Sequence, residues 1–296
     1  MYDIIVIGAG PAGLTAALFG LRANKKVLIL EAKAYGGQIL NANKIENYPG
    51  IDNISGFEFA TNLYNQVKKF GCEIKYETVE RVTENKEVIT NKETYSAKAV
   101  IIATGSENRK LRIDGEVEFV GRGISYCATC DGNFYKDKIV AVVGGGDNAL
   151  EDAIYLSDIV SKVYLIHRRD EFSGEERYIE EINSKPNIEK IMNSNITKII
   201  GEETLKQIEI TDNNSNTRVL DIDGLFIAVG REPKNEIFAN VATLNNLGYI
   251  IAKDNVHTNI DGIYVAGDAR EKELRQLTTA VSDGSLAATI AIKEMK

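Results

Sequence analysis

The chain has 296 residues, of which 35 are Lys or Arg and 43 are Asp or Glu, so its formal net charge at neutral pH is −8. A chain of this length is expected to form about two domains with sizeable cores. The acidic balance argues against nucleic-acid binding, which needs a basic surface. The first apolar run, Ile4–Ile7, is far shorter than the roughly 20 residues of a membrane span, and no secretory signal accompanies it. We therefore expect a cytoplasmic protein that binds neither nucleic acid nor a membrane.

The first predicted strand, Tyr2–Ile7, leads directly into a glycine loop and then into a helical pattern. A GxGxxG sequence between a strand and a helix is typical of dinucleotide-binding folds. In such a loop Gly8 would make the tight turn, Gly10 would let the backbone approach a pyrophosphate, and Gly13 would let the helix pack on the strand.

The helix after this loop is predicted to open with Pro11 and Ala12, where its N-terminus would face the phosphates. The next predicted strand, Lys26–Leu30, is followed by Glu31. A carboxylate at that position can bind a ribose diol. Strand, turn, helix and acid together predict a cofactor site.

A second copy of this pattern begins at the predicted strand Lys138–Val143 and continues through Gly144–Ala149 into another helix. The strand that follows, Lys162–Ile166, ends in basic residues instead of an acid. Two arginines suit a 2′-phosphate, so this copy predicts NADPH over NADH. The candidate nucleotide contacts are Gly144, Gly146, Asp147, His167, Arg168 and Arg169.

Each copy closes on an apolar strand that ends in glycine, Ala99–Gly105 in the first and Leu225–Gly230 in the second. A further strand pattern at Asp261–Ala269 precedes a predicted helix within Leu274–Lys296. This repeat predicts an α/β chain of two doubly wound, Rossmann-like nucleotide-binding domains, the second inserted into the first.

The expected domain boundaries follow from this insertion. Residues 1–110 and 236–296 would form a discontinuous dinucleotide-binding domain, and residues 111–235 an inserted NADPH-binding domain. Two dinucleotide sites in one chain suggest electron transfer between a flavin and a nicotinamide.

A CxxC motif, Cys127 to Cys130, lies just before the first strand of the inserted copy. A zinc site normally needs four ligands, and the other candidates, Cys72, His167 and His257, are not paired at metal spacing. We therefore predict no metal site. A redox disulfide is the favoured interpretation for a cytosolic chain.

Asp131 directly follows the motif and could supply or remove protons, or simply form the turn before Gly132. A helix that started at the motif would lower the pKa of a cysteine thiol there. The third cysteine, Cys72, is interpreted as a small buried hydrophobic residue.

The chain resembles the low-molecular-weight bacterial thioredoxin reductases over nearly its full length. Besides the two glycine loops, the resemblance rests on several short motifs. They are Gly36-Gly37-Gln38, Glu46-Asn47-Tyr48-Pro49-Gly50, Ala103-Thr104-Gly105, Gly123–Asp131, His167-Arg168-Arg169-Asp170, Gly267-Asp268 and Arg275-Gln276-Leu277. The resemblance implies bound FAD, a homodimer and NADPH-driven reduction of thioredoxin.

The resemblance also implies roles for single residues. Cys130 would be the thiol that faces the flavin, Cys127 the thiol that attacks thioredoxin, and Asp131 the acid–base residue. Asp268, Arg275 and Gln276 match the flavin contacts of the family, and Gly37, Gln38, Asn47 and Leu277 join them as candidate cofactor contacts from the same motifs.

This chain departs from the family pattern at two positions. The family usually has an arginine where Ser173 stands, and the loss of that contact is expected to weaken the hold on a 2′-phosphate by about 1 kcal/mol. Asn133 precedes Phe134 and Tyr135 where the family often has two aromatic residues after the motif. The choice of thioredoxin partner is therefore left open.

Three alternative functions keep the flavin and the cysteine pair. Reduced ferredoxin could replace NADPH, because its potential of about −400 mV lies below the roughly −270 mV of thioredoxin. A dithiol oxidase would pass electrons to oxygen, and a non-enzymatic redox sensor would signal through its cysteines. The glycine loop at Gly144 and the arginines Arg168 and Arg169 favour NADPH.

The predicted connectivity also suggests a conformational change. The cysteine pair would lie on the inserted domain and the flavin on the other, yet both the disulfide and the nicotinamide must reach the same flavin ring. We expect the domains to rotate between half-reactions about the crossings near Glu107–Arg112 and Arg231–Glu236.

Overall fold

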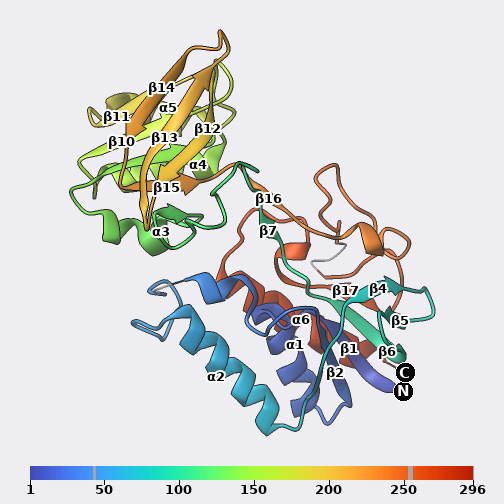
Figure 1. Cartoon of the computed structure of the whole chain (residues 1–296). Helices are drawn as coiled ribbons and strands as arrows, with labels where there is room; N and C mark the ends of the chain where they lie inside the picture. Colours follow the sequence, from blue (N-terminus) through green and yellow to red (C-terminus); the bar gives the residue numbers. More distant parts are fainter. Residues whose placement is uncertain (43–44, 253–255, 296) are drawn as a thin grey trace. The chain divides into compact units, whose positions relative to one another are not determined.

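A computed structural model describes residues 1–42, 45–252 and 256–295 of the chain (Figure 1). The chain divides into two compact units. The first unit comprises residues 1–107 and 232–296, and the inserted unit comprises residues 108–231. The expected boundaries, at 110/111 and 235/236, lie a few residues further along the chain.

The first unit is built on a parallel sheet in the order β3-β2-β1-β6-β17. The central strand β1 is buried on both faces from Ile4 onward, which explains its continuous apolar run. The strands are β1 (Tyr2–Ile7), β2 (Val27–Glu31), β3 (Glu73–Tyr76), β6 (Thr94–Ile102) and β17 (Ile263–Val265).

Helices cover one face of this sheet and a small antiparallel layer covers the other (Figure 1). The helices are α1 (Pro11–Arg22), α2 (Gly56–Lys69) and α6 (Leu277–Glu294). The opposite layer contains β4 (Val79–Val82), β5 (Glu87–Thr90) and the short η3 (Glu236–Phe238). Of the predicted C-terminal helix, Lys296 lies outside the described residues.

The inserted unit has a second parallel sheet, in the order β11-β10-β9-β15-β8. Its strands are β8 (Ile124–Ser125), β9 (Ile139–Val143), β10 (Lys162–Ile166), β11 (Ile188–Ile191) and β15 (Gly224–Ile227). Helices α4 (Asp147–Ser157) and α5 (Glu176–Ser184) pack on one face. The antiparallel strands β12 (Ser194–Gly201), β13 (Leu205–Asp212) and β14 (Thr217–Asp221) pack on the other.

The edge strand β8 decides where the cysteine motif lies. It is the first strand of this sheet along the chain, but it pairs in parallel with β15, and β15 in turn pairs with β9. Because parallel strands end at the same edge of a sheet, the motif after β8, the glycine loop after β9 and the basic turn after β10 share that edge. Ligands of doubly wound folds bind at this carboxyl edge.

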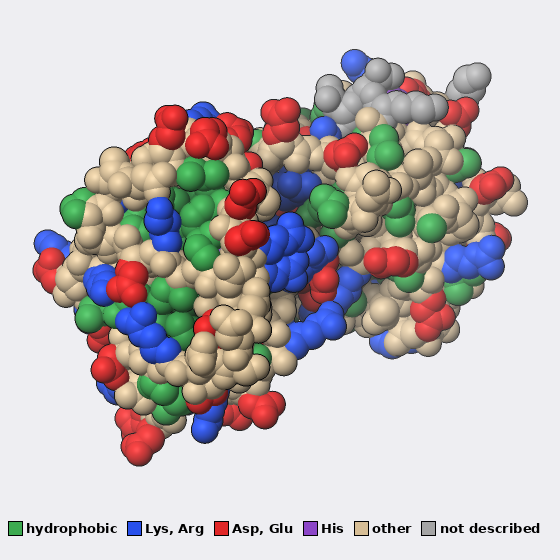
Figure 2. Space-filling view, turned by 90° about the horizontal axis from the view of Figure 1, so that it is seen from above, with side chains coloured by type: hydrophobic (Ala, Val, Ile, Leu, Met, Phe, Trp, Pro, Cys, Tyr) green, Lys and Arg blue, Asp and Glu red, His purple; other side chains and the backbone are tan. Residues whose placement is uncertain are grey.

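Both units have the strand order of a doubly wound nucleotide-binding fold, and the second unit interrupts the first. The predicted α/β fold class is therefore confirmed. Acidic and basic side chains are interspersed over the face that Figure 2 shows. Among the described residues, no helix is both long and apolar enough to cross a membrane.

Where the chain passes between the units, two short strands pair, β7 (Glu107–Asn108) with β16 (Arg231–Glu232). The carboxylate of Glu107 forms ion pairs with Lys33 and Lys234, each across 2.7 Å. These hydrogen bonds, from Lys234 and then Lys33, lower the pKa of Glu107 from 4.5 to about 2.

This lowered pKa predicts a pH-dependent contribution to stability. Since the folded-state pKa is depressed, the stabilisation is present above about pH 4.5 and is lost as the pH falls toward 2. Both lysines are largely exposed, so we expect Glu107→Gln to lower the free energy of unfolding at pH 7 by no more than about 1 kcal/mol. Urea unfolding at pH 7 and near pH 2.5 measures this, and a difference that persists unchanged at the lower pH would contradict it.

Candidate active site

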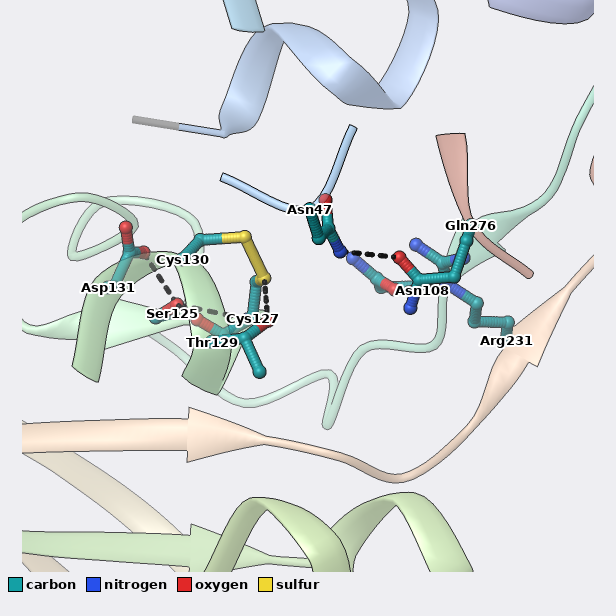
Figure 3. Close-up of a disulfide and its surroundings, with 9 residues drawn as sticks. All are labelled: Asn47, Asn108, Ser125, Cys127, Thr129, Cys130, Asp131, Arg231 and Gln276. Carbon is teal, nitrogen blue, oxygen red and sulfur yellow. Dashed lines mark hydrogen bonds between the residues drawn. A yellow bond between two sulfur atoms is a disulfide. The ribbon is translucent and has the colours of Figure 1, made fainter. Parts of the chain in front are cut away.

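Cys127 and Cys130 are joined by a disulfide immediately after β8, with their Cα atoms 5.3 Å apart (Figure 3). Both residues are half-buried. The helix that follows, α3 (Ala128–Asp131), has only four residues before the chain tightens into η2 (Gly132–Tyr135). A single turn supplies little macrodipole, so the expected helix-dipole effect on the thiols is small.

Ser125 links the disulfide to Asp131. Its hydroxyl donates to Oδ2 of Asp131 across 2.7 Å and accepts the backbone N–H of Cys127 across 3.0 Å (Figure 3). Ser125 is 5% exposed. The hydroxyl of Thr129 lies 3.5 Å from Sγ of Cys127. Ser125 lies within the Gly123–Asp131 motif, but the sequence alone does not reveal its hydrogen bond to Asp131.

A second tie involves Tyr126, the residue before Cys127. Its hydroxyl donates to the carboxylate of Glu116 across 2.7 Å. Glu116, 2% exposed, also accepts the backbone N–H groups of Leu111 and Arg112 at 3.0 and 2.8 Å. This buried carboxylate therefore fastens the end of the first crossing to the segment that carries the disulfide.

The three glycines of the first loop differ in what surrounds them. A Cβ on Gly8, whose φ is +107°, would lie 2.4 Å from the carbonyl oxygen of Ala103, and one on Gly13 would lie 1.9 Å from that of Gly8. These two glycines are required by contacts within the protein. Among the described residues, a Cβ on Gly10 would meet nothing within 4 Å. The open space in front of Gly10, at the start of α1, fits a pyrophosphate.

Glu31 holds this loop in place. Its carboxylate accepts the backbone N–H of Ala9 across 2.7 Å and that of Lys33 across 2.8 Å. Gly36 donates its N–H to the carbonyl of Ala9, and a Cβ on Gly37 would lie 3.3 Å from Cα of Gly10. A carboxylate retains acceptor capacity after two bonds, so Glu31 can support the loop and still accept a ribose hydroxyl.

The other motifs of the first unit gather near the start of α6. The side-chain amide of Asn47 donates to Oε1 of Gln276 across 3.2 Å, although 229 positions separate them (Figure 3). Gln276 caps α6, of which Leu277 is the first residue and is buried. The guanidinium of Arg275 stacks on Tyr249 at 4.1 Å, and its buried Nε has no hydrogen-bond partner within the described part of the chain. An orphaned buried donor is a group that a bound cofactor can satisfy.

Asp268 lies in a charge cluster that the motifs do not predict. It lies 3.6 Å from the ammonium of Lys272, which also contacts Asp283 across 3.1 Å. Asp283 further accepts from Arg270 across 3.3 Å and from the backbone N–H of Gly267 across 3.1 Å. The cluster is mostly buried and fixes the turn η4 (Gly267–Ala269) against α6. Asp268 and Arg270 have further interactions within the chain, and so does Gln38 in the short helix η1 (Gly37–Asn41).

The second glycine loop repeats the arrangement of the first. A Cβ on Gly144 would lie 2.4 Å from the carbonyl oxygen of Ala228, whereas one on Gly146 would meet only Oγ of Ser173, at 3.8 Å. Gly146 caps α4 and faces open space as Gly10 does. The loop therefore also fits a pyrophosphate.

His167 lies beneath this loop. A Cβ on Gly145 would approach its ring to 2.1 Å, and the imidazole is 7% exposed. Burial, and more weakly the charges of Arg169 and Arg168, lowers the pKa of His167, so its ring is neutral at pH 7. His167 thus supports the loop as a packed neutral ring and brings no positive charge to a phosphate.

The two arginines beside His167 are exposed, and within the described part of the chain neither guanidinium group has an ion pair. They are the free cations that a 2′-phosphate would require. Ser173 does not reach toward that charge, because both its N–H and its hydroxyl donate to the carbonyl of Gly145, at 2.7 and 3.1 Å. Asp147 accepts the N–H of Glu175 across 2.7 Å and so fixes the same loop.

Cys72 is separate from this chemistry. It is 3% exposed in the first unit, and burial raises the pKa of its thiol to about 12. No group of three or more His, Cys, Asp or Glu residues within the described ranges could hold a metal ion.

Comparisons with known proteins agree with this geometry. A family model described as pyridine nucleotide-disulphide oxidoreductase matches residues 2–284. The chain is 41% identical over 300 residues to a thioredoxin reductase of Listeria monocytogenes, covering 99% of this chain and 93% of that one. A crystal structure of thioredoxin reductase from Streptococcus pyogenes matches with a TM-score of 0.87 at 40% identity, covering 99% and 98% of the two chains. A ferredoxin-flavin thioredoxin reductase from Clostridium acetobutylicum matches with a TM-score of 0.53 at 32% identity, covering 99% and 97%.

The contrast between Gly10 and Gly13 gives a matched pair of variants. Gly10 has a φ of −75° that alanine adopts freely, and its Cβ would enter open space, so Gly10→Ala should leave the apoprotein as stable as the original. It should weaken FAD binding by at least about 10-fold, because the methyl group occupies the pyrophosphate space. Gly13→Ala should instead destabilise the apoprotein by roughly 1–3 kcal/mol.

Flavin fluorescence on release measures FAD binding, and thermal unfolding of the two apoproteins measures stability. Full FAD affinity in Gly10→Ala would show that the loop does not hold the pyrophosphate.

Proposed function

The chain belongs to the pyridine nucleotide-disulphide oxidoreductase family, and from that premise we propose that it is a flavoprotein thioredoxin reductase that uses NADPH. The observation that carries this proposal is the shared carboxyl edge of the inserted sheet. There the Cys127–Cys130 disulfide follows β8, an open glycine loop follows β9 and two exposed arginines follow β10, while the first unit holds a second open glycine loop. When bound, FAD would accept two electrons from NADPH and pass them to the disulfide.

We assign FAD to the first unit. The space in front of Gly10 would take the pyrophosphate, and Glu31 would accept a ribose hydroxyl while it holds Ala9. The orphaned Nε of Arg275 and the cluster around Asp268 support a polar contact near the start of α6. Pro11, Ala12 and Gly13 would place the N-terminus of α1 against the phosphates, with Gly37, Gln38, Asn47, Gln276 and Leu277 around the remainder of the cofactor.

We assign NADPH to the inserted unit. Gly144 and Gly146 would admit the pyrophosphate, Asp147 would fix the loop, and Arg168 with Arg169 would bind the 2′-phosphate. His167 would act from below, as a neutral ring on which Gly145 rests.

The dithiol chemistry would use Cys127, Cys130 and Asp131. Cys127 would attack the disulfide of thioredoxin, and Cys130 would then displace thioredoxin by closing the bond to Cys127. The hydroxyl of Thr129, near Sγ of Cys127, can donate to the thiolate that forms there. Asp131 would exchange the proton that each leaving sulfur must gain or lose.

Connectivity supports a rotation of the two units between half-reactions. The disulfide belongs to the inserted unit and the assigned flavin site to the first, and the chain passes between the units at two crossings, near β7 and β16. Rotation about the crossings would let the disulfide and the nicotinamide reach the flavin in turn. We also propose a cytoplasmic homodimer, which light scattering on the purified protein would test.

Reduced ferredoxin remains the main alternative donor, since one relative is a ferredoxin-flavin enzyme. The open Gly146 and the exposed arginines favour NADPH, because an enzyme without a nucleotide donor has no use for either. A dithiol oxidase or a redox sensor would need none of the thioredoxin exchange proposed for Cys127.

Anaerobic turnover tests this function. The protein should reduce thioredoxin with NADPH, and Cys130→Ser should abolish that turnover while NADPH still bleaches the flavin, because the variant has no disulfide to reduce. Cys72→Ala, which removes a buried thiol outside the site, should change neither reaction. If the protein turned over with reduced ferredoxin and not with NADPH, ferredoxin would be its electron donor. If electrons passed only to oxygen, the protein would be an oxidase.

Ser173 predicts a weakened preference for NADPH. Ser173→Arg keeps the backbone bond to Gly145 and adds a charge next to Gly146, so it should tighten NADPH by on the order of 1 kcal/mol, about 5-fold, and leave NADH unchanged. Ser173→Ala, which loses the hydroxyl bond without adding charge, is the matched control. The dissociation constants of both variants for NADPH and NADH test this prediction. If Ser173→Arg tightened NADH as much as NADPH, residue 173 would not lie near the 2′-phosphate.

A further inference from the structure

We infer that Ser125 is a positioning residue for thiol–disulfide exchange, acting through Asp131 to hold its carboxylate beside the Cys127–Cys130 disulfide. The inference rests on the proposed dithiol function and extends it to a residue outside the cysteine–aspartate set. Ser125 ends β8, at the carboxyl edge of the inserted sheet, and is buried. Its position is therefore set by the sheet and not by the short α3.

The hydrogen-bond geometry gives the hydroxyl a defined direction. A serine hydroxyl has one hydrogen, and Asp131 Oδ2 at 2.7 Å is a closer acceptor than the carbonyl of Cys127 at 3.3 Å. The lone pairs are then free to accept the N–H of Cys127 at 3.0 Å. One side chain thus fixes both the backbone of the exchanging cysteine and the acid–base carboxylate (Figure 3).

The backbone of Asp131 is held at its own turn, where its N–H donates to the carbonyl of Cys127 across 3.2 Å. That bond fixes the backbone but not the side-chain torsions, which the 2.7 Å hydrogen bond from Ser125 to Oδ2 constrains. Hydrogen bonds to charged groups are stronger than those between neutral groups. Ser125 is therefore placed to select one orientation of the carboxylate.

The relevant step can be written without a cofactor. A dithiothreitol thiolate forms a bond to Sγ of Cys127, the Sγ–Sγ bond breaks, and the electron pair stays on Sγ of Cys130, which gains a proton through Asp131. The second dithiothreitol sulfur then displaces Cys127. Dithiothreitol is oxidised to its cyclic disulfide, and its two S–H hydrogens end on Cys127 and Cys130.

A double-mutant cycle on this reaction tests the inference. FAD-loaded Ser125→Ala, Asp131→Asn and the double variant are opened anaerobically with dithiothreitol, quenched with a maleimide and analysed by mass. We expect Ser125→Ala to slow opening roughly 10-fold, the loss typical of one hydrogen bond to a charged group. Because Ser125 acts through Asp131, the double variant should be no slower than Asp131→Asn alone.

Three further variants complete the design. Ser194→Ala is the matched control: Ser194 is also 5% exposed in the inserted unit and donates to a carbonyl two residues away, and its loss should leave the rate unchanged. Ser125→Thr, which keeps the hydroxyl, should recover most of the rate. Should Ser125→Ala not fold, Ser125→Gly, which lets water replace the hydroxyl, takes its place in the same cycle.

Two results would overturn the inference. One is an unchanged rate in Ser125→Ala, and the other is an equal slowing by that change whether residue 131 is Asp or Asn. Since the assay contains neither NADPH nor thioredoxin, a non-additive cycle in a protein that fails NADPH–thioredoxin turnover would refute the proposed function and keep this inference.

Discussion

The close approach of backbone at the two glycine loops is the constraint on which the other features depend. Gly8 and Gly144 leave room for neighbouring carbonyl oxygens, and this brings the start of each following helix to the carboxyl edge of its sheet. A Cβ on Gly10 would meet no described residue within 4 Å, and one on Gly146 would meet only Oγ of Ser173 at 3.8 Å. Because protein contacts explain the first pair and not the second, the open pair marks where dinucleotides are expected to bind.

Chemistry follows from which strands share an edge. The inserted unit places β8 beside β15, so the disulfide lies along the same edge as the glycine loop that follows β9, although β15 separates the two strands. Buried polar side chains then fix the details: Glu116 ties the crossing to Tyr126, and Ser125 ties Asp131 to Cys127. In the first unit, Asp283 fixes the turn at Asp268 by accepting the N–H of Gly267 and by pairing with Lys272.

The sequence predicts the elements whose periodicity is strong and misses contacts between distant segments. Strand β1, helix α1 and the glycine loops follow from local pattern, and so does the repeat that defines the fold. Strand β8 has only two residues and carries no period of its own. The bond from Ala9 to Glu31 and the burial of His167 beneath Gly145 depend on tertiary placement, as do the ion pairs of Lys272. A polar residue in a sequence does not indicate its hydrogen-bond or ion-pair partner, so these contacts become visible only in the folded chain.

The route of electrons is the central claim, and its most direct test is the order of events after anaerobic mixing with NADPH. Flavin absorbance and trapped thiols at Cys127 and Cys130 are followed in the same stopped-flow and quench experiment. The account predicts that the flavin bleaches first, that the two thiols appear next, and that added thioredoxin is reduced only after them. Absence of bleaching with NADPH, or thiols that appear while the flavin has stayed oxidised throughout, would contradict it.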